Sequence, residues 1–348
     1  MATLCRHLDR AMFELQLAVV DLRGAVYQGD IPPDVTIVDL KARRVRTALP
    51  RIVRLLWRTR PHIVFSTLGQ LNLALAICKS FLPRDACYVA REASIVSLLP
   101  SIYTLPRWWL WAYKRFYHRF NMIVCQSRAM RDDLVKNFGV PEAKTVVINN
   151  PVDIEQVNSL ASKVSEDLFA GHLPPQIKLV AAGTLIPVKG FDVLLRALAL
   201  TSAMDFQLII LGEGPLRGEL EQLSASLGVA SRVRFAGFAS NPYAYFRQAD
   251  AFVLCSVFEG FPNAVLEALA CGTPVVATPG AGGVLELLNS VDGCVVAQDR
   301  SEQALANALR RIDRRRVPTQ ALSQYSVSNI VKQYQAVFSA CARSQIEN

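Results

Sequence analysis

The sequence is poor in the residues that bind metals. Its 348 residues include only four histidines, and no D-x-D motif or cluster of histidines is present, so we expect no metal cofactor. The eight cysteines lie apart in apolar segments with no C-x-x-C pair, which predicts buried, reduced thiols rather than zinc ligands or disulfides. No G-x-G-x-x-G follows the first strand-like run, which argues against a dinucleotide-dependent dehydrogenase.

Long apolar runs are also missing. The best candidate, residues 63–82, is interrupted by Ser66, Gln70, Asn72 and Lys79, so we expect no membrane-spanning helix. The first residues show no charged start followed by an apolar stretch and a small-residue cleavage site. We therefore expect a cytoplasmic protein.

The composition is that of a compact globular protein, with 51% hydrophobic and 19% charged residues. Because 348 residues exceed the usual size of a single core, two domains are expected. The formal net charge of +9 indicates an anionic partner, either nucleic acid, anionic lipid or a phosphorylated substrate. Charge alone does not distinguish these partners.

Short β-branched runs alternate with helical patterns along the chain, which predicts an α/β fold with parallel sheets and helices on both faces. The runs that predict strands are residues 13–20, 62–66, 86–92, 122–127, 144–150, 177–183, 206–212, 232–238, 251–256, 274–278 and 293–297. The polar segment 150–176 contains Pro-Pro near its end and predicts a linker. Two facing sheets would share one ligand site beyond the carboxyl ends of their strands.

The segment 258–272, "FEGFPNAVLEALACG", places Glu259 and Glu267 on either side of a bend. Gly260 permits close backbone approach, Pro262 suits a first helical position, and the following amides form a donor array at a helix N-terminus. Glu259 can accept hydrogen bonds from sugar hydroxyls, and Glu267 from a vicinal diol such as that of ribose. The alternative is one acidic residue that interacts with the helix dipole and one that faces solvent.

At this point the sequence resembles the GT4-type retaining glycosyltransferases. The resemblance is carried by E-x7-E within "FEGFPNAVLEALACGTPVVAT" and extends over residues 181–198, 208–223, 232–238, 245–256 and 280–288. It implies the GT-B fold of two facing Rossmann-like domains and a nucleoside-diphosphate sugar as donor substrate. No metal or other cofactor is implied, and the sugar would be transferred with retention of configuration.

The family's diphosphate-binding lysine corresponds to Lys189 of "IPVKG". A fixed ammonium stabilises the negative charge that develops as the nucleoside diphosphate leaves. An ordinary surface lysine before a helix is the alternative. The family usually has an arginine directly after the preceding glycine, Gly183, where this chain has Thr184, and we expect Arg217 or another basic residue to replace it.

The resemblance thus implies Lys189 and Glu259 as the catalytic residues. It implies a donor site formed by Gly183, Thr184, Glu213, Gly214, Arg217, Gly260, Phe261, Pro262, Asn263, Glu267, Gly282 and Gly283. The glycine-rich loop 278–286 offers backbone amides to a phosphate or the sugar. This loop and the loop 211–215 could equally be tight strand-to-helix turns.

The N-terminal half resembles the family less sharply, over residues 62–77, 89–94, 122–140 and 146–153. Arg91 and Glu92 are expected to face the acceptor side of the cleft at the end of a strand. The alternative is an ion pair that closes the loop. Residues 1–20 look like the end of the first helix and the second strand of the family, so the resemblance implies that a first strand and glycine-rich loop are missing, and we expect a truncated or degraded gene.

An aromatic and basic segment covers residues 99–120. Trp108, Trp109, Trp111, Lys114 and Arg115 are expected to face an anionic membrane, where a lipid-linked acceptor would be presented. Core packing with a basic outer face is the alternative. No nucleic-acid motif accompanies these residues, so we expect no nucleic-acid partner.

The resemblance implies a glycosyltransferase, and the aromatic and basic segment leads us to expect that it acts at the inner face of the cell membrane. It would move a sugar to a lipid-linked or glycan acceptor in the synthesis of a cell-surface polysaccharide such as lipopolysaccharide, or of a glycoconjugate. We expect an acceptor domain at residues 1–155, a donor domain at 156–326, and a helix at 327–348 that packs back on the first domain. A non-catalytic relative that binds nucleotide or a partner is the alternative, favoured by Thr184 and the missing loop.

Overall fold

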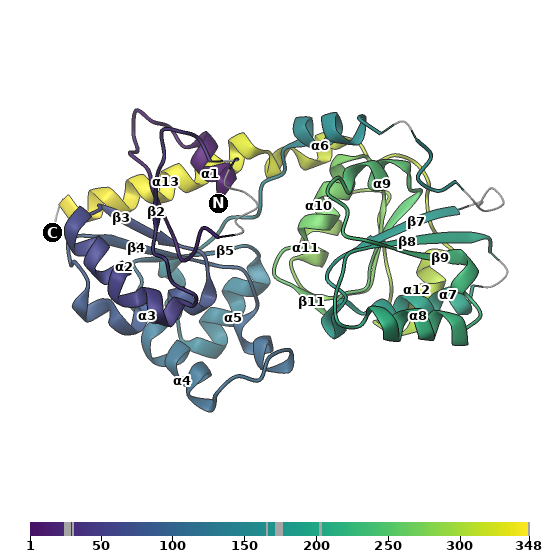
Figure 1. Ribbon diagram of the computed structural model, residues 1–348, viewed down its shortest axis with the longest axis horizontal. Helices are drawn as coiled ribbons and strands as arrows, with labels where there is room; N and C mark the ends of the chain where they lie inside the picture. The colour runs from purple at the N-terminus through teal and green to yellow at the C-terminus, as the bar shows by residue number, and fades with distance from the viewer. Residues whose placement is uncertain (24–28, 30, 165, 171–176, 202–203, 347–348) are drawn as a thin grey trace. The chain divides into compact units, whose positions relative to one another are not determined.

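The computed structural model describes residues 1–23, 29, 31–164, 166–170, 177–201 and 204–346. The chain forms two compact units (Figure 1). The N-terminal unit comprises Met1–Asn149 and Val327–Asn348, and the C-terminal unit comprises Asn150–Ser326. The division falls between Asn149 and Asn150, whereas the sequence places it at 155/156.

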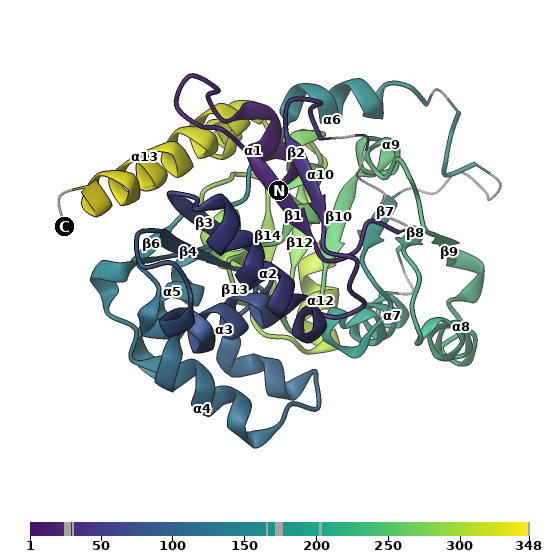
Figure 2. The ribbon, with the colours of Figure 1, turned by 60° about the vertical axis from the view of Figure 1, so that its left-hand side comes forward.

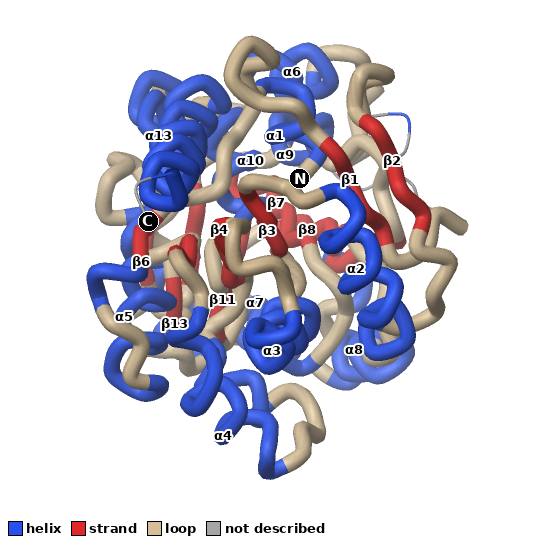
Figure 3. Tube along the Cα trace, turned by 90° about the vertical axis from the view of Figure 1, so that its left-hand side faces the viewer, coloured by secondary structure: helices blue, strands red, loops and turns tan. Residues whose placement is uncertain are grey.

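The N-terminal unit contains a two-stranded and a four-stranded sheet, both parallel. The strands are β1 (Gln16–Val19), β2 (Thr36–Asp39), β3 (Ile63–Ser66), β4 (Cys87–Glu92), β5 (Met122–Cys125) and β6 (Thr145–Val147). Figure 3 shows β1 beside β2. Ser66 pairs with Ala90 and Glu92 pairs with Cys125, so the carboxyl ends of β3, β4 and β5 lie along one edge of the sheet.

The helices of the N-terminal unit cover both faces of the four-stranded sheet. They are α1 (Ala2–His7), α2 (Val45–Thr59), α3 (Gly69–Cys78), α4 (Arg107–Phe116), α5 (Arg128–Phe138) and α13 (Val327–Ile346). Cys87 and Val89 pack with α1 and α13 on one face, while Tyr88 and Ala90 pack with α2 to α5 on the other (Figures 1 and 2). This division follows from the alternation of side chains along a strand.

The C-terminal unit has a six-stranded parallel sheet in the order β14-β12-β10-β7-β8-β9, and a separate pair β11-β13. These strands are β7 (Ile177–Ala182), β8 (Phe206–Leu211), β9 (Val233–Gly237), β10 (Ala251–Leu254), β11 (Phe258–Glu259), β12 (Val275–Ala277), β13 (Ala281–Gly282) and β14 (Val295–Val296). The helices are α6 (Ile154–Ala161), α7 (Phe191–Ala199), α8 (Arg217–Ser226), α9 (Tyr243–Gln248), α10 (Asn263–Ala270), α11 (Val284–Leu288) and α12 (Glu302–Leu309). Helices α7, α8 and α12 cover one face, and α6, α9, α10 and α11 cover the other (Figure 1).

The predicted α/β class and parallel sheets are confirmed, and each run predicted as a strand contains one. The sequence missed β2, β11 and β13. The prediction of a linker at 150–176 is wrong in its first part, because α6 lies there and buries Val157 and Ala161 in the core of the C-terminal unit. Residues 165 and 171–176 lie outside the described residues.

The expectation that every cysteine is reduced is wrong for one pair. Cys87 of β4 and Cys341 of α13 form a disulfide across a sequence separation of 254 residues. Spacing could not reveal this pair, because α13 returns to β4 from the far end of the chain. The described residues include no helix with both the length and the apolar character that crossing a bilayer requires.

Phe338 of α13 should stabilise the N-terminal unit. It is 4% exposed, and its ring centroid lies 5.2 Å from that of Phe65. We expect Phe338→Ala to lower the free energy of unfolding of this unit by about 3–5 kcal/mol, because a cavity is left. Chemical denaturation followed by tryptophan fluorescence measures this unit, because the four tryptophans all lie in it.

The control is Lys332→Ala, which changes an exposed residue of the same helix and should leave the transition unchanged. Equal stability of the Phe338→Ala and Lys332→Ala proteins would contradict the role of α13 in the core.

Candidate active site

Lys189 and Glu259 form an ion pair in the C-terminal unit. Lys189 Nζ lies 2.6 Å from Glu259 Oε1, and their side chains are 24% and 16% exposed. The hydroxyl of Ser256, which the sequence analysis did not single out, donates to the same carboxylate oxygen at 2.7 Å. The two residues predicted to bind different parts of a donor therefore lie in direct contact.

Gly190 allows the lysine loop to reach the glutamate. Lys189 ends the 3-10 turn η6 (Pro187–Lys189) beyond β7, and Gly190 follows with φ of 64°. A Cβ atom at Gly190 would lie 2.2 Å from the carbonyl oxygen of Cys255, just beyond β10. The amide of Val257 donates to Val188 O at 2.8 Å, which fastens the two loops together. A glycine is therefore required at position 190 for this approach.

The two glycine-rich segments of the predicted donor site pair with each other. In the β11-β13 pair, Glu259 lies opposite Gly282. The amide of Gly283 donates to Gly260 O at 3.2 Å. The segments were predicted as separate loops, and the structure joins them beside the ion pair.

The bend before α10 differs in detail from the prediction. Pro262 is the N-cap residue, and α10 begins at Asn263. Asn263 is exposed, and its Oδ1 accepts a hydrogen bond from Asn150 Nδ2 at 2.6 Å. Phe261 is buried, with its ring centroid 5.7 Å from that of Tyr325. Of Phe261, only the backbone can therefore make the predicted contact with a donor.

Glu267 lies in the second turn of α10 and is partly buried. Burial raises the pKa of its carboxyl group from 4.5 to about 7. Among the described residues we find no hydrogen bond or ion pair that satisfies this carboxyl group. Its oxygens are therefore free to accept hydrogen bonds from a ligand.

The loop after β7 lies against the loop after β8. The aliphatic chain of Lys189 passes over Gly183, since a Cβ atom on this glycine would lie 3.4 Å from Lys189 Cδ. A Cβ atom on Gly214 would lie 2.5 Å from the backbone of Leu185, so the two loops approach closely. Thr184 is exposed between them.

Arg217, expected as a possible additional cation, is bound to neighbouring groups of the C-terminal unit. Its guanidinium is bound to Glu213 at 2.7 Å, Glu221 at 2.9 Å and the carbonyl oxygen of Phe235 at 3.1 Å. These bonds keep the Arg217 guanidinium beside the start of α8. The expectation that Arg217 replaces the missing arginine stays a prediction, and these two partly exposed ion pairs would have to rearrange for Arg217 to bind a diphosphate.

Arg91 and Glu92 lie at the end of β4 but do not form the pair that the sequence suggested. The Arg91 side chain hydrogen-bonds to Tyr334 of α13. Glu92 is 2% exposed and accepts bonds from Asn72 and Tyr117. The prediction that Glu92 faces a cleft is wrong, because successive strand residues point to opposite faces and this one points into the packed face.

The aromatic and basic helix is α4. Trp109 is 8% exposed and packs on Tyr113, with ring centroids 4.4 Å apart, so the prediction that Trp109 faces a membrane is wrong. The helical period places these two residues on the inner face of α4. The outer face carries the exposed residues Trp108, Trp111, Lys114 and Arg115.

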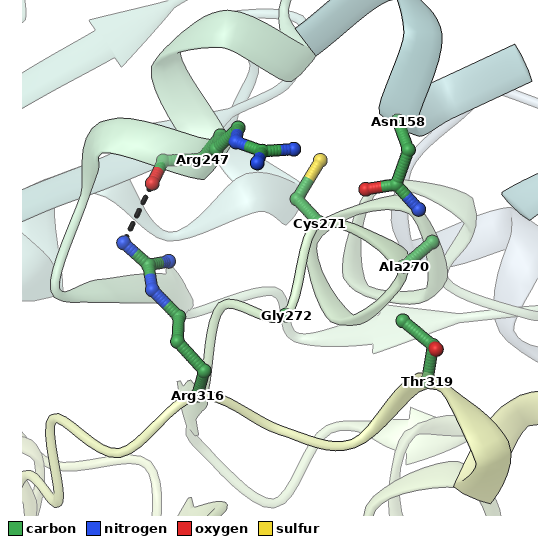
Figure 4. A pocket seen from close by; sticks show the side chains of 7 residues that line it. All are labelled: Asn158, Arg247, Ala270, Cys271, Gly272, Arg316 and Thr319. Carbon is green, nitrogen blue, oxygen red and sulfur yellow. Dashed lines mark hydrogen bonds between the residues drawn. The ribbon is translucent and has the colours of Figure 1, made fainter. Parts of the chain in front are cut away.

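A hollow of about 250 Å³ lies at the other end of α10 (Figure 4). Asn158, Arg247, Cys271, Arg316 and Thr319 contribute to its lining, and none of them belongs to the predicted site. Arg316 donates to Arg247 O at 2.6 Å and to the hydroxyl of Thr273, so it mainly fastens the segment after α12 to the core.

Family models match both halves of the chain. Residues 1–156 match the model described as Glycosyltransferase Family 4, and residues 176–314 match the model described as Glycosyl transferases group 1. The two matches correspond closely to the N-terminal and C-terminal units.

Curated relatives are also similar to this chain. The N-acetylgalactosamine-N,N'-diacetylbacillosaminyl-diphospho-undecaprenol 4-alpha-N-acetylgalactosaminyltransferase of Campylobacter jejuni is 32% identical over 56% of this chain and 51% of its own length. The GDP-mannose-dependent alpha-(1-6)-phosphatidylinositol dimannoside mannosyltransferase of Mycobacterium tuberculosis is 35% identical over 40% of this chain and 36% of its own length. The chain thus spans about half the length, or less, of these relatives.

A solved structure supports the fold. The Anabaena protein HepE in complex with UDP has a TM-score of 0.75 and 22% identity, and the match covers 97% of this chain and 96% of HepE. This likeness shows the fold, and the family models and relatives show the family. The chain belongs to the GT4-type glycosyltransferases with the GT-B fold.

Proposed function

We propose that the protein transfers a sugar from a nucleoside-diphosphate sugar to a lipid-linked or glycan acceptor. The observation that carries this proposal is the contact of Lys189 with Glu259 beside the paired segments of Gly260 and Gly282. One cation, one carboxylate and a set of backbone amides thereby converge beyond the carboxyl ends of parallel strands. That is where α/β folds bind their ligands.

The donor would be bound by three kinds of group. The ammonium of Lys189, the amides that follow Gly283 and those at the start of α10 would bind the diphosphate, since they offer positive electrostatic potential to an anion; the Gly283 amide itself is bonded to Gly260 O. Glu259 would accept hydrogen bonds from hydroxyls of the sugar, and Glu267 from the two ribose hydroxyls. The proposal of a nucleotide donor is supported by HepE, whose structure contains UDP, and by the mycobacterial relative, which is named for GDP-mannose.

The ion pair would also take part in the transfer step. As the glycosidic bond to the diphosphate breaks, negative charge develops on the leaving oxygen, and the pre-positioned ammonium of Lys189 stabilises it. Glu259 keeps the ammonium in place before the donor arrives. We infer retention of configuration, with the acceptor attacking the face that the diphosphate leaves and with no protein nucleophile. This step, and the expectation that no metal is needed, rest on the family resemblance.

A lipid-linked acceptor is supported by the names of the two relatives, which include undecaprenol and phosphatidylinositol. We propose that the exposed face of α4 binds the inner leaflet of the cell membrane, where such an acceptor would be presented. Its tryptophans suit the interface, and its basic residues suit anionic headgroups. The product would enter a cell-surface polysaccharide, such as lipopolysaccharide, or a glycoconjugate.

The exposed aromatic surface extends beyond α4. Arg119 lies over the ring of Phe116 and donates to the carbonyl of Ile77 at the end of α3. Farther along, Phe81 is 74% exposed, and its carbonyl accepts a hydrogen bond from the indole of Trp57. A membrane contact centred on α4 could therefore include the end of α3.

A non-catalytic protein that binds nucleotide or a partner is the second candidate. It is favoured by Thr184, which stands where the family has an arginine, and by the ion pairs that hold both Lys189 and Arg217. Measurable sugar transfer in the presence of a suitable acceptor would exclude this candidate.

Replacement of the ion-pair residues tests the donor site. Glu259→Ala should lower sugar transfer at least about 100-fold, and Lys189→Ala should abolish the rise in melting temperature that a matching nucleotide produces. Melting curves with UDP, GDP, ADP and their sugars, followed by transfer assays, measure both effects.

The matched controls are Glu219→Ala and Lys163→Ala, which change exposed residues of the same unit. Near-wild-type transfer by a folded Glu259→Ala protein would overturn the assignment. A nucleotide-dependent melting shift without transfer to any acceptor would favour the non-catalytic candidate.

Glu267→Gln should raise the stability of the folded protein at high pH and at the same time lower its affinity for the nucleotide. The folded pKa of Glu267 is raised, so between about pH 4.5 and 7 the carboxyl group ionises in the unfolded state only, and stability falls as the pH rises. At pH 8 the glutamine protein should be more stable by about 1–3 kcal/mol, while at pH 4 the difference should vanish.

Nucleotide affinity should nevertheless fall, because glutamine offers one acceptor oxygen instead of two. Glu219→Gln is the control for both measurements. Unchanged affinity in the stabilised Glu267→Gln protein would show that Glu267 does not bind the ribose.

Replacement of Trp108 and Trp111 by alanine should weaken binding to phosphatidylglycerol vesicles about 10-fold or more, because two exposed indoles are lost. Co-sedimentation at fixed ionic strength measures the effect. Phe238→Ala, which removes an 80% exposed aromatic residue from the C-terminal unit, is the control. Equal vesicle binding by the wild-type protein, the Trp108→Ala/Trp111→Ala protein and the Phe238→Ala protein would refute the membrane role of α4.

A further inference from the structure

A carboxylate group is buried in the N-terminal unit at the carboxyl end of β4. Glu92 is 2% exposed and accepts hydrogen bonds from Asn72 Nδ2 at 3.1 Å, Tyr113 Oη at 3.5 Å, Tyr117 Oη and the amide of Ala93. Asn72 belongs to α3, Tyr113 to α4, and Tyr117 to the 3-10 turn η4 (Tyr117–Arg119). None of these four partners carries a positive charge.

Such a group is costly to bury. Burial raises the pKa of Glu92, while the hydrogen bonds from Tyr117 and Asn72 act in the opposite direction. An apolar side chain of similar size would avoid the desolvation of a carboxyl group altogether. The contribution of Glu92 is therefore structural: its carboxylate connects α3, α4 and η4 by hydrogen bonds.

One side of the network fixes the loop between β3 and α3. Asn72 Nδ2 also donates to Arg91 O at 3.0 Å, and its Oδ1 accepts from the Ser66 hydroxyl at 2.7 Å. The single proton of the Tyr113 hydroxyl is shared between two acceptors, Gly69 O at 3.2 Å and the more distant Glu92 Oε1 at 3.5 Å. The ends of β3 and β4 and the start of α3 are thereby joined through the residues that contact Glu92.

The loop that is fixed in this way lies at the edge where ligands bind in parallel α/β sheets. Leu68, the last residue of this loop, is 54% exposed, and Gln70 in the first turn of α3 is also exposed. An apolar and a polar side chain are thus presented together, which suits an acceptor that combines a lipid with a sugar.

The other side of the network is helix α4. Tyr113 and Tyr117 stack with ring centroids 4.5 Å apart, and α4 carries the exposed residues Trp108 and Trp111 on its opposite face. Glu92 therefore links the helix proposed to meet the membrane with the loop that precedes α3.

We propose that Glu92 is a positioning residue for the acceptor, which holds residues 67–70 against α4 so that Leu68 and Gln70 contact a lipid-linked sugar. This inference rests on the proposed function. Glu92 itself does not touch the substrate; it acts through Asn72, Tyr113 and Tyr117.

Glu92→Ala, Glu92→Gln and Tyr117→Phe test the proposal. We expect Glu92→Ala to raise the KM for the acceptor about 10- to 100-fold, because a displaced loop misplaces the acceptor. The KM for the donor should stay unchanged, because the proposed donor residues belong to the C-terminal unit. Glu92→Gln retains one acceptor oxygen and should restore much of the acceptor affinity, while Tyr117→Phe should show an intermediate loss.

Glu142→Ala, at an exposed glutamate of the same unit, is the control. A merely structural role for Glu92 would change both KM values or lower activity through the amount of folded protein, without rescue by glutamine. An unchanged acceptor KM in folded Glu92→Ala protein would overturn the proposal.

Hydrogen exchange provides a readout that does not require activity. In the Glu92→Ala protein the amides of residues 67–73 should exchange faster, while those of β5 and α13 should keep their wild-type rates. Uniformly faster exchange, or no change at 67–73, would overturn the positioning role. If the wild-type protein transfers no sugar to any acceptor, the proposed function fails, and the exchange data still decide whether Glu92 braces the loop.

Discussion

The contact between Lys189 and Glu259 is the interaction on which the rest of the candidate site depends. It requires Gly190, whose backbone approaches the carbonyl of Cys255 too closely for a side chain. Each charge lowers the cost of partly burying the other, and both are thereby held in place before a ligand arrives. Because Glu259 already balances Lys189 in part, and Thr184 adds no charge, the proposed diphosphate site would need backbone amides at the start of α10 in addition to the ammonium of Lys189.

The strands were predictable because parallel sheets are buried on both faces and their strands read as continuous apolar runs. Strand β2 was missed although it is as long as β1 and no more exposed, so length and burial do not explain the omission; β11 and β13 have two residues each and lie outside the main sheet. Helix α6 was missed because the segment 150–176 was interpreted as a linker, although Ile154, Val157 and Ala161 follow the spacing of a helical face. The disulfide of Cys87 with Cys341 depends on tertiary packing, so no local pattern contains it.

The sequence named Lys189 and Glu259 but could not show that they touch, because 70 residues separate them. The directions of other side chains follow from the geometry of their strand or helix, which the positions of the residues in the sequence do not show. Arg91 and Glu92 are neighbours in a strand, so one reaches Tyr334 of α13 while the other enters the packing of α3 and α4. The same reasoning explains why only part of the tryptophan cluster on α4 is exposed.

Two partly or fully buried carboxylates, Glu267 and Glu92, illustrate what the structure adds. Both are raised in pKa by burial, yet their surroundings differ: Glu92 accepts bonds from four donors, whereas no donor to Glu267 is found in the described part of the chain. A satisfied carboxylate has little capacity left for a ligand, and it acts on its neighbours. An unsatisfied one keeps its desolvation cost until a ligand supplies the missing donors. On the two proposals, the number of donors would separate a positioning carboxylate, Glu92, from a binding one, Glu267, and this number depends on the fold rather than on the spacing of residues.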